Sequence, residues 1–202
     1  METGIVDSLA RPGGNITGVA RLTHELSGKR LELFKEAVPR ISRVGVFADR
    51  ESPSSRQYES TARTLNLSFE SLEINQPNPD LEALFRSAAK ARVNAIVMTA
   101  SRSINRYAKQ IIELALKNRL PSMFEISTRV DAGGLMSYSA DDAALFRRAA
   151  VYVDKIVKGT KPADLPIEQP TKFELVINLK TAKALNLIIP QSVLYRADRV
   201  IK

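Results

Sequence analysis

The sequence has 202 residues, of which 44% are hydrophobic, so it can bury a core as one large domain or two small ones. It contains no cysteine, which excludes disulfide bonds, thiolate metal sites and a thiol nucleophile. A net charge of +8 would attract nucleic acid or an anionic membrane. The basic residues are spread over separate predicted helices, mixed with acids, and lack an aromatic stacking pattern. We therefore expect no nucleic-acid partner.

Targeting signals are absent from the sequence as printed. No apolar run is long enough to cross a bilayer, and the residues after Met1 lack the basic start and apolar middle of a secretory signal.

Four short segments of the chain read as β-strands, because they are rich in β-branched or aromatic residues: 43–49, 68–74, 94–100 and 121–126. Each is joined to the next by a segment with helical periodicity, which is typical of a parallel sheet with crossover helices. The third and fourth strands are almost wholly apolar, as in strands covered on both faces. Residues 68–74 alternate between polar and apolar, so we place them at or near an edge.

The helices between these strands follow from apolar stripes and end signals. The segment 27–38 is halted by Pro39. The segment 80–92 has Asp80 as a capping residue, and 103–119 is predicted as one helix that Ser103 could cap.

The pattern changes after "DAGGLMSYS", residues 131–139. A long amphipathic helix begins near Asp141 or Asp142 and ends at Gly159, followed by a proline-rich connector at 161–170. One more strand, "FELVIN", a short helix and a tail complete the chain. Residues 1–20 read as the close of a helix, a Pro-Gly-Gly turn and the start of a strand.

Several stretches of this sequence resemble one protein family. "SLARPGGNITGVA", "GKRLELFKEAVP", "AGGLMSYS", "YVDKIVKGTKPADLPIEQPTKFELVINLKTAKALNL" and "IPQSVLYRADRVI" are similar to the ABC transporter substrate-binding proteins, a family that includes tryptophan- and tyrosine-binding members. The resemblance runs over essentially the whole chain.

The resemblance implies an α/β fold of the type I periplasmic binding protein kind, with two Rossmann-like lobes joined by three crossing segments. "NITGVA" resembles the first crossing, "GGLMSYS" the second and "LPIEQPTKFEL" the third. We expect residues 19–136 to form a complete α/β lobe. Residues 1–18 and 137–202 would form a partial second lobe and the hinge crossings. The glycines at 133 and 134 would let the backbone turn out of one lobe, and the aspartates at 141 and 142 would cap the first helix of the other.

The sequence also departs from the family. Family members carry a signal or lipoprotein leader and most of their first lobe before the "ARPGGN" segment, whereas this chain begins just upstream of it. We therefore expect either a fragment or a gene whose annotated start lies too far downstream. An incomplete lobe would leave sheet edges and apolar faces uncovered, so we expect marginal solubility for this form. By the resemblance, the full-length protein would be a monomer in the periplasm or anchored outside the cytoplasmic membrane.

Candidate ligand-binding residues lie after the strands, because ligands of open parallel sheets sit beyond the carboxyl ends of the strands. This rule selects Asp49, Thr99, Ser101 and Glu125, with Phe124 beside them. Asp49 or Glu125 could bind the ammonium group of an amino acid, and helix starts at Ser52 or Ser54 and at Ser103 could bind its carboxylate. Phe124 or Tyr138 could stack on an aromatic ligand.

The crossing segments contribute a second group of candidates, which comprises Asn15, Thr17, Ser137 and Tyr138. Each candidate has a simpler alternative: Ser and Asp as helix caps or loop residues, Phe124 as a core residue, and the crossing residues as polar turns.

Three function classes remain open. The first is the solute-binding component of an ABC importer, which captures a small molecule in an interlobe cleft by hinge closure and delivers it to membrane permease subunits. The second is an enzyme, but the single histidine, His24, lacks a nucleophile or acid partner, and we expect no catalytic residues, metal or cofactor. The third is the ligand-sensing domain of a regulator. The coding sequence upstream of Met1 separates transport from regulation through a signal or a DNA-binding domain.

Overall fold

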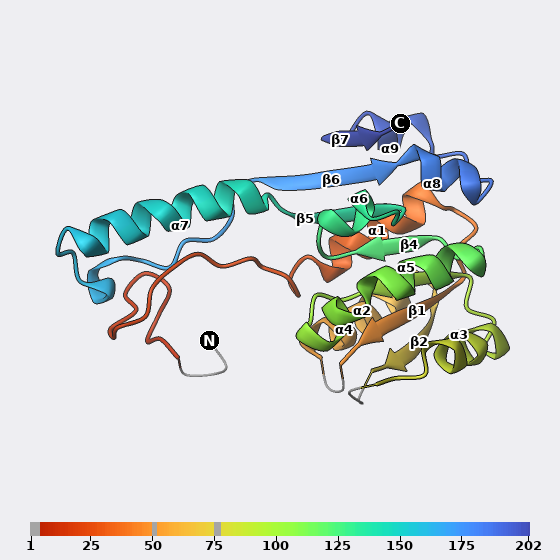
Figure 1. Cartoon of the computed structure of the whole chain (residues 1–202), viewed down its shortest axis with the longest axis horizontal. Coiled ribbons are helices and arrows are strands. Elements are labelled where there is room, and N and C mark those ends of the chain that lie inside the picture. The colour runs from red at the N-terminus through yellow and green to blue at the C-terminus, as the bar shows by residue number, and fades with distance from the viewer. Residues whose placement is uncertain (1–4, 50–51, 75–77) are drawn as a thin grey trace. The chain divides into compact units, whose positions relative to one another are not determined.

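The structure is a computed structural model that describes residues 5–49, 52–74 and 78–202, apart from the side chains of Arg102 and Ser103. Its contacts divide the chain into two compact units. The larger unit contains Thr23–Ser139 and Glu174–Lys202, and the smaller contains the chain up to Leu22 together with Ala140–Phe173. Figure 1 shows the elements of both units.

A seven-stranded sheet with the order β2-β1-β3-β4-β5-β6-β7 organises the larger unit. The strand pairs β2–β1, β1–β3, β3–β4, β4–β5 and β6–β7 are parallel. The strands are β1 (Arg43–Ala48), β2 (Ser68–Glu73), β3 (Ala95–Met98), β4 (Ser122–Phe124), β5 (Met136–Ala140), β6 (Phe173–Asn178) and β7 (Arg199–Ile201). The α/β class with a parallel sheet is therefore confirmed, and β2 lies at an edge as its alternating pattern predicts.

Helices cover both faces of this sheet (Figure 1). One apolar cluster joins one face to α1 (Ser27–Ala37), α2 (Pro53–Thr64), α8 (Leu179–Ala184) and α9 (Gln191–Leu194). A second cluster joins the other face to α3 (Leu81–Lys90), α4 (Arg102–Arg106) and α5 (Ala108–Lys117). The short α6 (Thr128–Asp131) precedes β5.

Period-two alternation explains how one strand serves both clusters. In β1, Val44 and Val46 belong to the first cluster and Phe47 to the second. Gly45 faces the second cluster beside Leu72 and Val93, where a Cβ atom would lie 2.8 Å from Leu72 Cδ1. Buried on both faces, β3 is apolar throughout.

The sequence patterns missed some element boundaries. The segment predicted as one helix at 103–119 is divided at Tyr107 into α4 and α5. The segment "GGLMSYS", predicted as a crossing, supplies β5, and the tail supplies α9 and β7. Residues 5–18 contain no helix, so within the described part the expected helix close is not found. By contacts, Glu174–Lys202 belong with 23–139 in the larger unit.

The smaller unit consists of the long helix α7 (Asp142–Val157), the 3-10 turn η1 (Pro162–Asp164) and two extended segments. Asp141 caps α7, because its Oδ1 accepts a hydrogen bond of 3.0 Å from the N–H of Ala144. The first and third predicted crossings run side by side here: Val19 and Glu168 form a parallel bridge, and the N–H of Ala20 donates to the carbonyl of Glu168 at 2.8 Å. Among the described helices, none is long and apolar enough to cross a membrane.

Candidate ligand site at the sheet switch point

A cavity of about 410 Å³ lies at the carboxyl ends of β1 and β3. Along the chain, the sheet grows from β1 to β2 in one direction and from β3 to β4 and β5 in the other. The place between β1 and β3 where the direction reverses is the switch point of the sheet, and ligands of such sheets bind in the crevice there. Residues of four segments line the cavity: Thr23, His24, Asp49, Ser52, Pro53, Ser54, Thr99, Ala100 and Ser101. Three of the predicted site residues, Asp49, Thr99 and Ser101, are thus brought together in one wall.

Hydrogen bonds fix the segment that follows β3. Thr99 is 2% exposed, and its hydroxyl donates to the carbonyl of Phe47 at 3.0 Å. The Ser101 hydroxyl accepts a hydrogen bond of 3.1 Å from the N–H of Ile104 and so caps α4. Ser101 therefore fulfils the simpler capping role and still lines the cavity.

The amino terminus of α2 forms another part of the wall. Ser52 is the N-cap residue, its side chain makes no capping hydrogen bond, and Pro53 occupies the first turn. First-turn N–H groups lack a carbonyl one turn earlier and carry partial positive charge. This helix end can therefore bind an anionic group of a ligand. The helix end predicted at Ser103 is α4, which begins at Arg102; the Ser103 side chain lies outside the described part.

A buried polar cluster lies behind this wall. Glu125 is 5% exposed, and its Oε2 accepts a hydrogen bond of 2.7 Å from the N–H of Ala100. Its Oε1 lies 3.1 Å from the Tyr58 hydroxyl and 3.3 Å from Arg30 Nη1. Burial raises the pKa of Glu125 above its ordinary value, and the positive charge of Arg30 opposes that rise. Burial also raises the pKa of Tyr58, and the negative charge of Glu125 adds to the effect.

Glu125 and Phe124, both predicted to touch a ligand, are buried and do not line the cavity. Glu125 is not among the residues that line the cavity; its carboxylate instead holds Ala100, which does line it. Phe124 is fully buried in the cluster with α3 and α5, and its ring packs where a Cβ on Gly134 would fall. Position at the end of a strand cannot show whether a side chain faces the ligand crevice or packs between the sheet and its helices.

The crossing candidates occupy different surroundings. Ser137 is fully buried, and among the described residues its hydroxyl has no hydrogen-bond partner. Tyr138 is half-buried against the first apolar cluster. Thr17 donates to the carbonyl of Leu165 at 2.6 Å, and Asn15 is exposed in the smaller unit. None of these four is among the residues lining the cavity, and their contact with a ligand stays a prediction.

Arg30 and Tyr58 were not predicted from the sequence. The sequence did contain a signal that Arg30 is buried. Arg30 lies four residues before Phe34 and seven before Ala37, so the three share the buried face of α1. A charged residue within an apolar stripe predicts a buried polar partner. The partner, Glu125, comes from a segment 95 residues away, so no local pattern could identify it.

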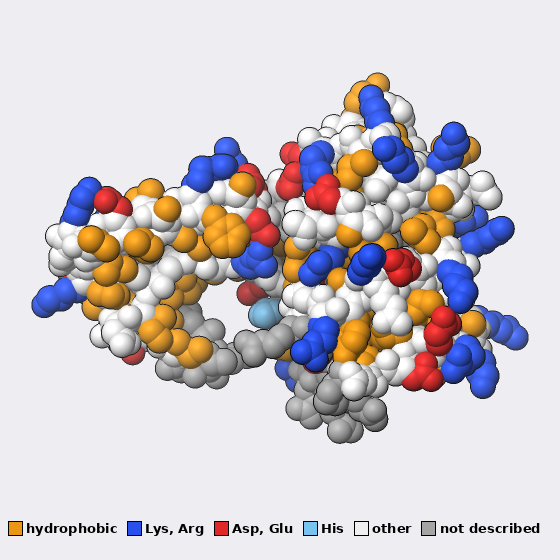
Figure 2. Space-filling model, in the orientation of Figure 1, with side chains coloured by type: hydrophobic (Ala, Val, Ile, Leu, Met, Phe, Trp, Pro, Cys, Tyr) orange, Lys and Arg blue, Asp and Glu red, His pale blue; other side chains and the backbone are white. Residues whose placement is uncertain are grey.

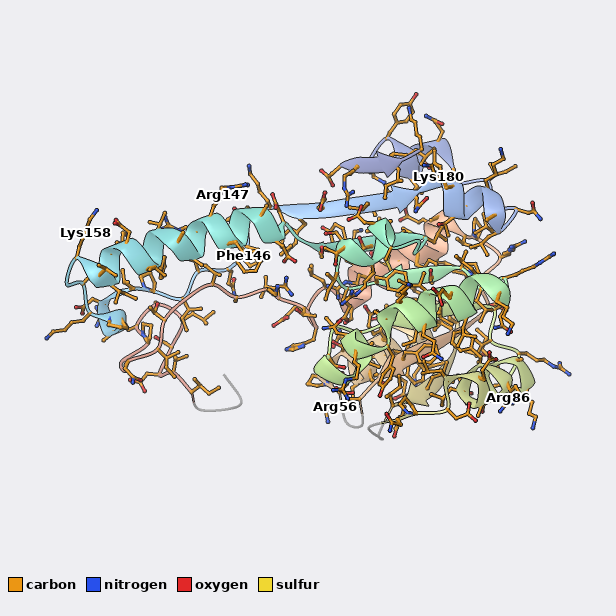
Figure 3. The ribbon with its side chains drawn as sticks, viewed as in Figure 1. Arg56, Arg86, Phe146, Arg147, Lys158 and Lys180 are labelled. Carbon is orange, nitrogen blue, oxygen red and sulfur yellow. The ribbon has the colours of Figure 1, made fainter. Side chains whose placement is uncertain are left out.

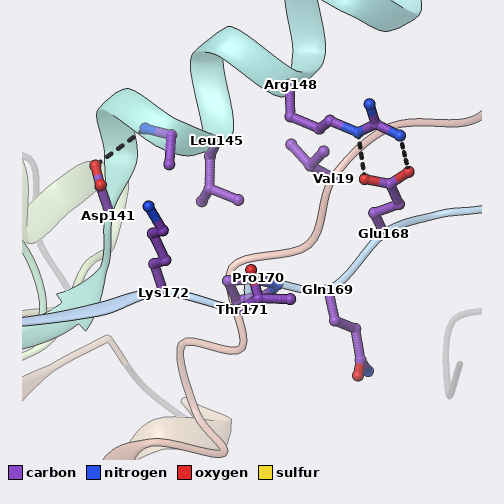
Figure 4. Close-up of a pocket in the computed structure, with 10 residues that line it drawn as sticks. Val19, Asp141, Leu145, Arg148, Glu168, Gln169, Pro170, Thr171 and Lys172 are labelled. Carbon is purple, nitrogen blue, oxygen red and sulfur yellow. Dashed lines mark hydrogen bonds and ion pairs between the residues drawn. The ribbon is translucent and has the colours of Figure 1, made fainter.

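A second cavity, of about 310 Å³, lies in the smaller unit between α7 and the third crossing (Figure 4). Arg148 of α7 forms a two-point ion pair with Glu168, one bond of which, from Nε to Oε2, measures 2.5 Å. Hydrogen bonding from Arg148 lowers the pKa of Glu168 below its ordinary value. The Tyr152 hydroxyl donates to the carbonyl of Pro166 at 2.5 Å. These satisfied contacts attach α7 to the extended segment.

The first cavity offers an acid, hydroxyl groups and a positively polarised helix end within one wall. Such a set suits a small molecule that carries both an ammonium and a carboxylate group. In the described part of the chain, no group of three or more His, Asp or Glu residues is arranged to hold a metal ion.

Solved structures share this fold over nearly the whole chain. The chain matches a conserved domain protein from Vibrio cholerae with a TM-score of 0.86 and 22% identity, over 97% of this chain and 66% of that one. It matches an ABC domain from Streptococcus pneumoniae, solved in complex with L-Trp, with a TM-score of 0.83 and 26% identity, over 98% of this chain and 68% of that one.

Sequence comparison gives a consistent result. A tyrosine-binding protein from Clostridioides difficile (strain R20291) is 24% identical over 191 residues, which are 93% of this chain and 54% of that protein. The chain thus spans about half the length of this relative. The family model described as ABC transporter substrate binding protein matches residues 1–201. This family is named for substrate binding rather than catalysis, and the chain belongs to it.

Proposed function

We propose that this protein is the solute-binding component of an ABC importer and that the cavity at the β1/β3 switch point forms part of its ligand site. The observation that carries the proposal is the convergence of Asp49, Thr99 and Ser101 on that cavity. The family match supports it, and so does the position of the cavity, which is where open parallel sheets bind ligands.

The ligand that we propose is a free amino acid, with an aromatic one tested first. Asp49 would bind the ammonium group, and the first turn of α2 with the Ser101 hydroxyl would bind the carboxylate. Names of relatives favour an aromatic side chain: one is a tyrosine-binding protein, and another was solved with L-Trp.

The mechanism that we propose is hinge closure. Ligand contacts from both lobes would favour the closed state, because a ligand shifts a conformational equilibrium by its differential affinity for the two states. The closed protein would then deliver its ligand to permease subunits outside the cytoplasmic membrane. We expect small-angle scattering of the longest natural form containing this chain to show a smaller radius of gyration when ligand saturates it. An unchanged radius at saturation would contradict closure.

Isothermal titration calorimetry tests the binding function. The longest natural form is titrated with L-tryptophan, L-tyrosine, L-phenylalanine, L-leucine and L-glutamate at one temperature and ionic strength. We expect saturable binding of at least one aromatic amino acid and weaker or no binding of L-glutamate, because the first turn of α2 is assigned to the α-carboxylate and the charge of Asp49 would repel a second carboxylate. Absence of saturable heat with every amino acid would overturn the proposal.

A further inference from the structure

Arg30 is a positively charged side chain within the core of the larger unit. It is 1% exposed and is among the largest of the fully buried side chains. It lies on α1, whose buried residues include Leu31, Phe34 and Ala37. Removing a guanidinium from water is costly unless hydrogen bonds and an opposite charge compensate. A buried arginine is therefore expected to make several defined contacts.

The guanidinium of Arg30 contacts four oxygen atoms. Nε donates to the carbonyl of Tyr138 at 2.6 Å, and Nη1 donates to the carbonyl of Thr23 at 2.5 Å. Nη1 also lies 3.3 Å from Glu125 Oε1 and 3.5 Å from the Tyr58 hydroxyl. Two of these acceptors are backbone groups, so the side chain fixes main-chain positions and not only other side chains.

The two backbone acceptors lie where the chain passes between the units. Thr23 is the first residue of the larger unit after the first passage, and Tyr138 precedes the second passage, which follows Ser139. We call residues 20–24 and 136–140 the passage segments. In each of the two passage segments, Arg30 thus holds the end that belongs to the larger unit.

The side-chain acceptor also leads to the cavity, which Thr23 itself lines. Glu125 accepts the N–H of Ala100 at 2.7 Å and is also hydrogen-bonded by the side chain of Ser54. Both Ala100 and Ser54 line the cavity, whereas Arg30 does not. One guanidinium therefore contacts the two passage segments and, through one carboxylate, two parts of the cavity wall.

We propose that Arg30 is a positioning residue that couples the wall of the switch-point cavity to both passage segments, so that ligand occupancy and hinge motion depend on one another through the Arg30–Glu125 pair. The ligand part of this inference rests on the proposed function. Arginine suits the role, because its planar fork presents donors in fixed directions to several acceptors at once. Lysine would keep the charge but concentrate its donors at one nitrogen.

Amide hydrogen exchange on the ligand-free protein tests the coupling without any ligand. In the Arg30→Lys variant, we expect the amides of both passage segments and those of residues 99–101 to exchange about tenfold faster, because opening becomes easier at all three places. The control is Arg199→Lys: Arg199 is likewise an ion-paired arginine, but it lies on the edge strand β7 and pairs with Asp131 and Glu174. Faster exchange at only one of the three places, or at none, would overturn the proposal.

Glu125→Gln provides a second test that does not remove the arginine. It preserves the shape of the side chain and removes its negative charge. If Arg30 and Glu125 act as one unit, exchange rises at Ala100 and also in both passage segments. A purely local role of Glu125 predicts an increase at Ala100 alone, and that result would contradict the coupling. This test stands even if Arg30→Lys fails to fold.

Calorimetry and scattering then address ligand coupling in the folded variants. We expect Arg30→Lys to bind the best wild-type amino acid about tenfold more weakly and to close incompletely at saturation, since coupling between sites commonly changes affinity about 5- to 150-fold. Wild-type affinity and full closure in a folded Arg30→Lys protein would overturn this inference alone. Lack of ligand binding by the wild type would overturn the proposed function, and the exchange experiments would still decide whether Arg30 couples the three places.

Discussion

Gly133 and Gly134 stand before β5 for different physical reasons. Gly133 has φ +108°, a backbone conformation that side chains rarely adopt. At Gly134, an added Cβ would lie 2.3 Å from Phe124 Cε2 and 2.8 Å from the carbonyl oxygen of Arg129. The glycine pair could be recognised from the sequence as a turn. The close approach at Gly134 could not, because it depends on a ring from another strand.

Gly134→Ala should therefore destabilise the protein, because a rigid buried ring and a backbone carbonyl obstruct the new methyl group. We expect a loss of about 1–3 kcal/mol in the free energy of unfolding, measured by urea denaturation. Gly14→Ala is the control, since nothing lies within 4 Å of the point where its methyl group would fall. Equal stability of the two variants would contradict the packing described for Gly134.

Asp49 carries the second prediction at the residue scale. Asp49→Asn removes the charge that we assign to the ligand ammonium, and hydrogen bonds to charged groups contribute about 1.5–3 kcal/mol. Affinity for the best amino acid, measured by calorimetry, should fall about tenfold or more. Asp154→Asn, on the exposed surface of α7, should leave the affinity unchanged. If both variants bind like the wild type, Asp49 does not hold the ammonium.

Among the elements, apolar strands and capped helices could be predicted well. Asp80 and Asp141 cap α3 and α7 as their positions before apolar stripes indicate. By contrast, β5 contains two buried serines, which a strand pattern does not predict, and β7 has three residues, too few to show a period of two. The break at Tyr107 was missed because the apolar stripe continues across it, from Ile104 to Ala108 and Ile111.

The attachment of α7 to the third crossing should depend on pH. Because Arg148 lowers the folded-state pKa of Glu168 below the ordinary value of 4.5, the pair stabilises the protein above that pH. The stabilisation is lost as pH falls through the folded-state pKa.

We therefore expect the wild type to melt roughly 2 °C above Glu168→Gln at pH 7, since partly exposed ion pairs contribute little. The difference should close below about pH 4.5 in thermal scans followed by circular dichroism. Glu113→Gln, at an exposed position of α5, serves as the control. A difference that persists undiminished at about pH 3 would show that the charge of Glu168 is not its source.

For the molecule as a whole, the most conspicuous surface feature is apolar. Phe146, Val153 and Val157 of α7 are 72%, 61% and 81% exposed. Figure 2 shows hydrophobic side chains along this helix, and Figure 3 shows Phe146 and Arg147 projecting from different sides of it. Among the apolar residues of α7, Leu145 is buried whereas Val153 and Ile156 are exposed.

Exposed apolar stripes favour association. We expect the 202-residue chain to self-associate with increasing concentration in sedimentation velocity, and the triple variant Phe146→Ser, Val153→Thr, Val157→Thr to sediment closer to a monomer. Ile188→Thr, at a single residue that is 93% exposed outside α7, should not have this effect. A single monomeric boundary for the unmodified chain at every concentration would contradict the expectation.

The overall fold could be predicted because its signals are repeated along the chain: alternating strands and helices, and long motifs shared with one family. The candidate site could be predicted only in part. The rule that ligands bind beyond strand ends identified Asp49, Thr99 and Ser101, which line the cavity. It also selected Glu125, which is turned toward Arg30, because the orientation of a side chain depends on partners distant in sequence.

A crystal structure of the longest natural form, grown with L-tryptophan or L-tyrosine, whichever calorimetry shows to bind more tightly, tests the proposed ligand site most directly. We predict ligand density in the cavity between β1 and β3, with the ammonium within hydrogen-bond distance of Asp49 and the carboxylate at the start of α2. Ligand density at another place, with the switch-point cavity filled only by solvent, would contradict this assignment.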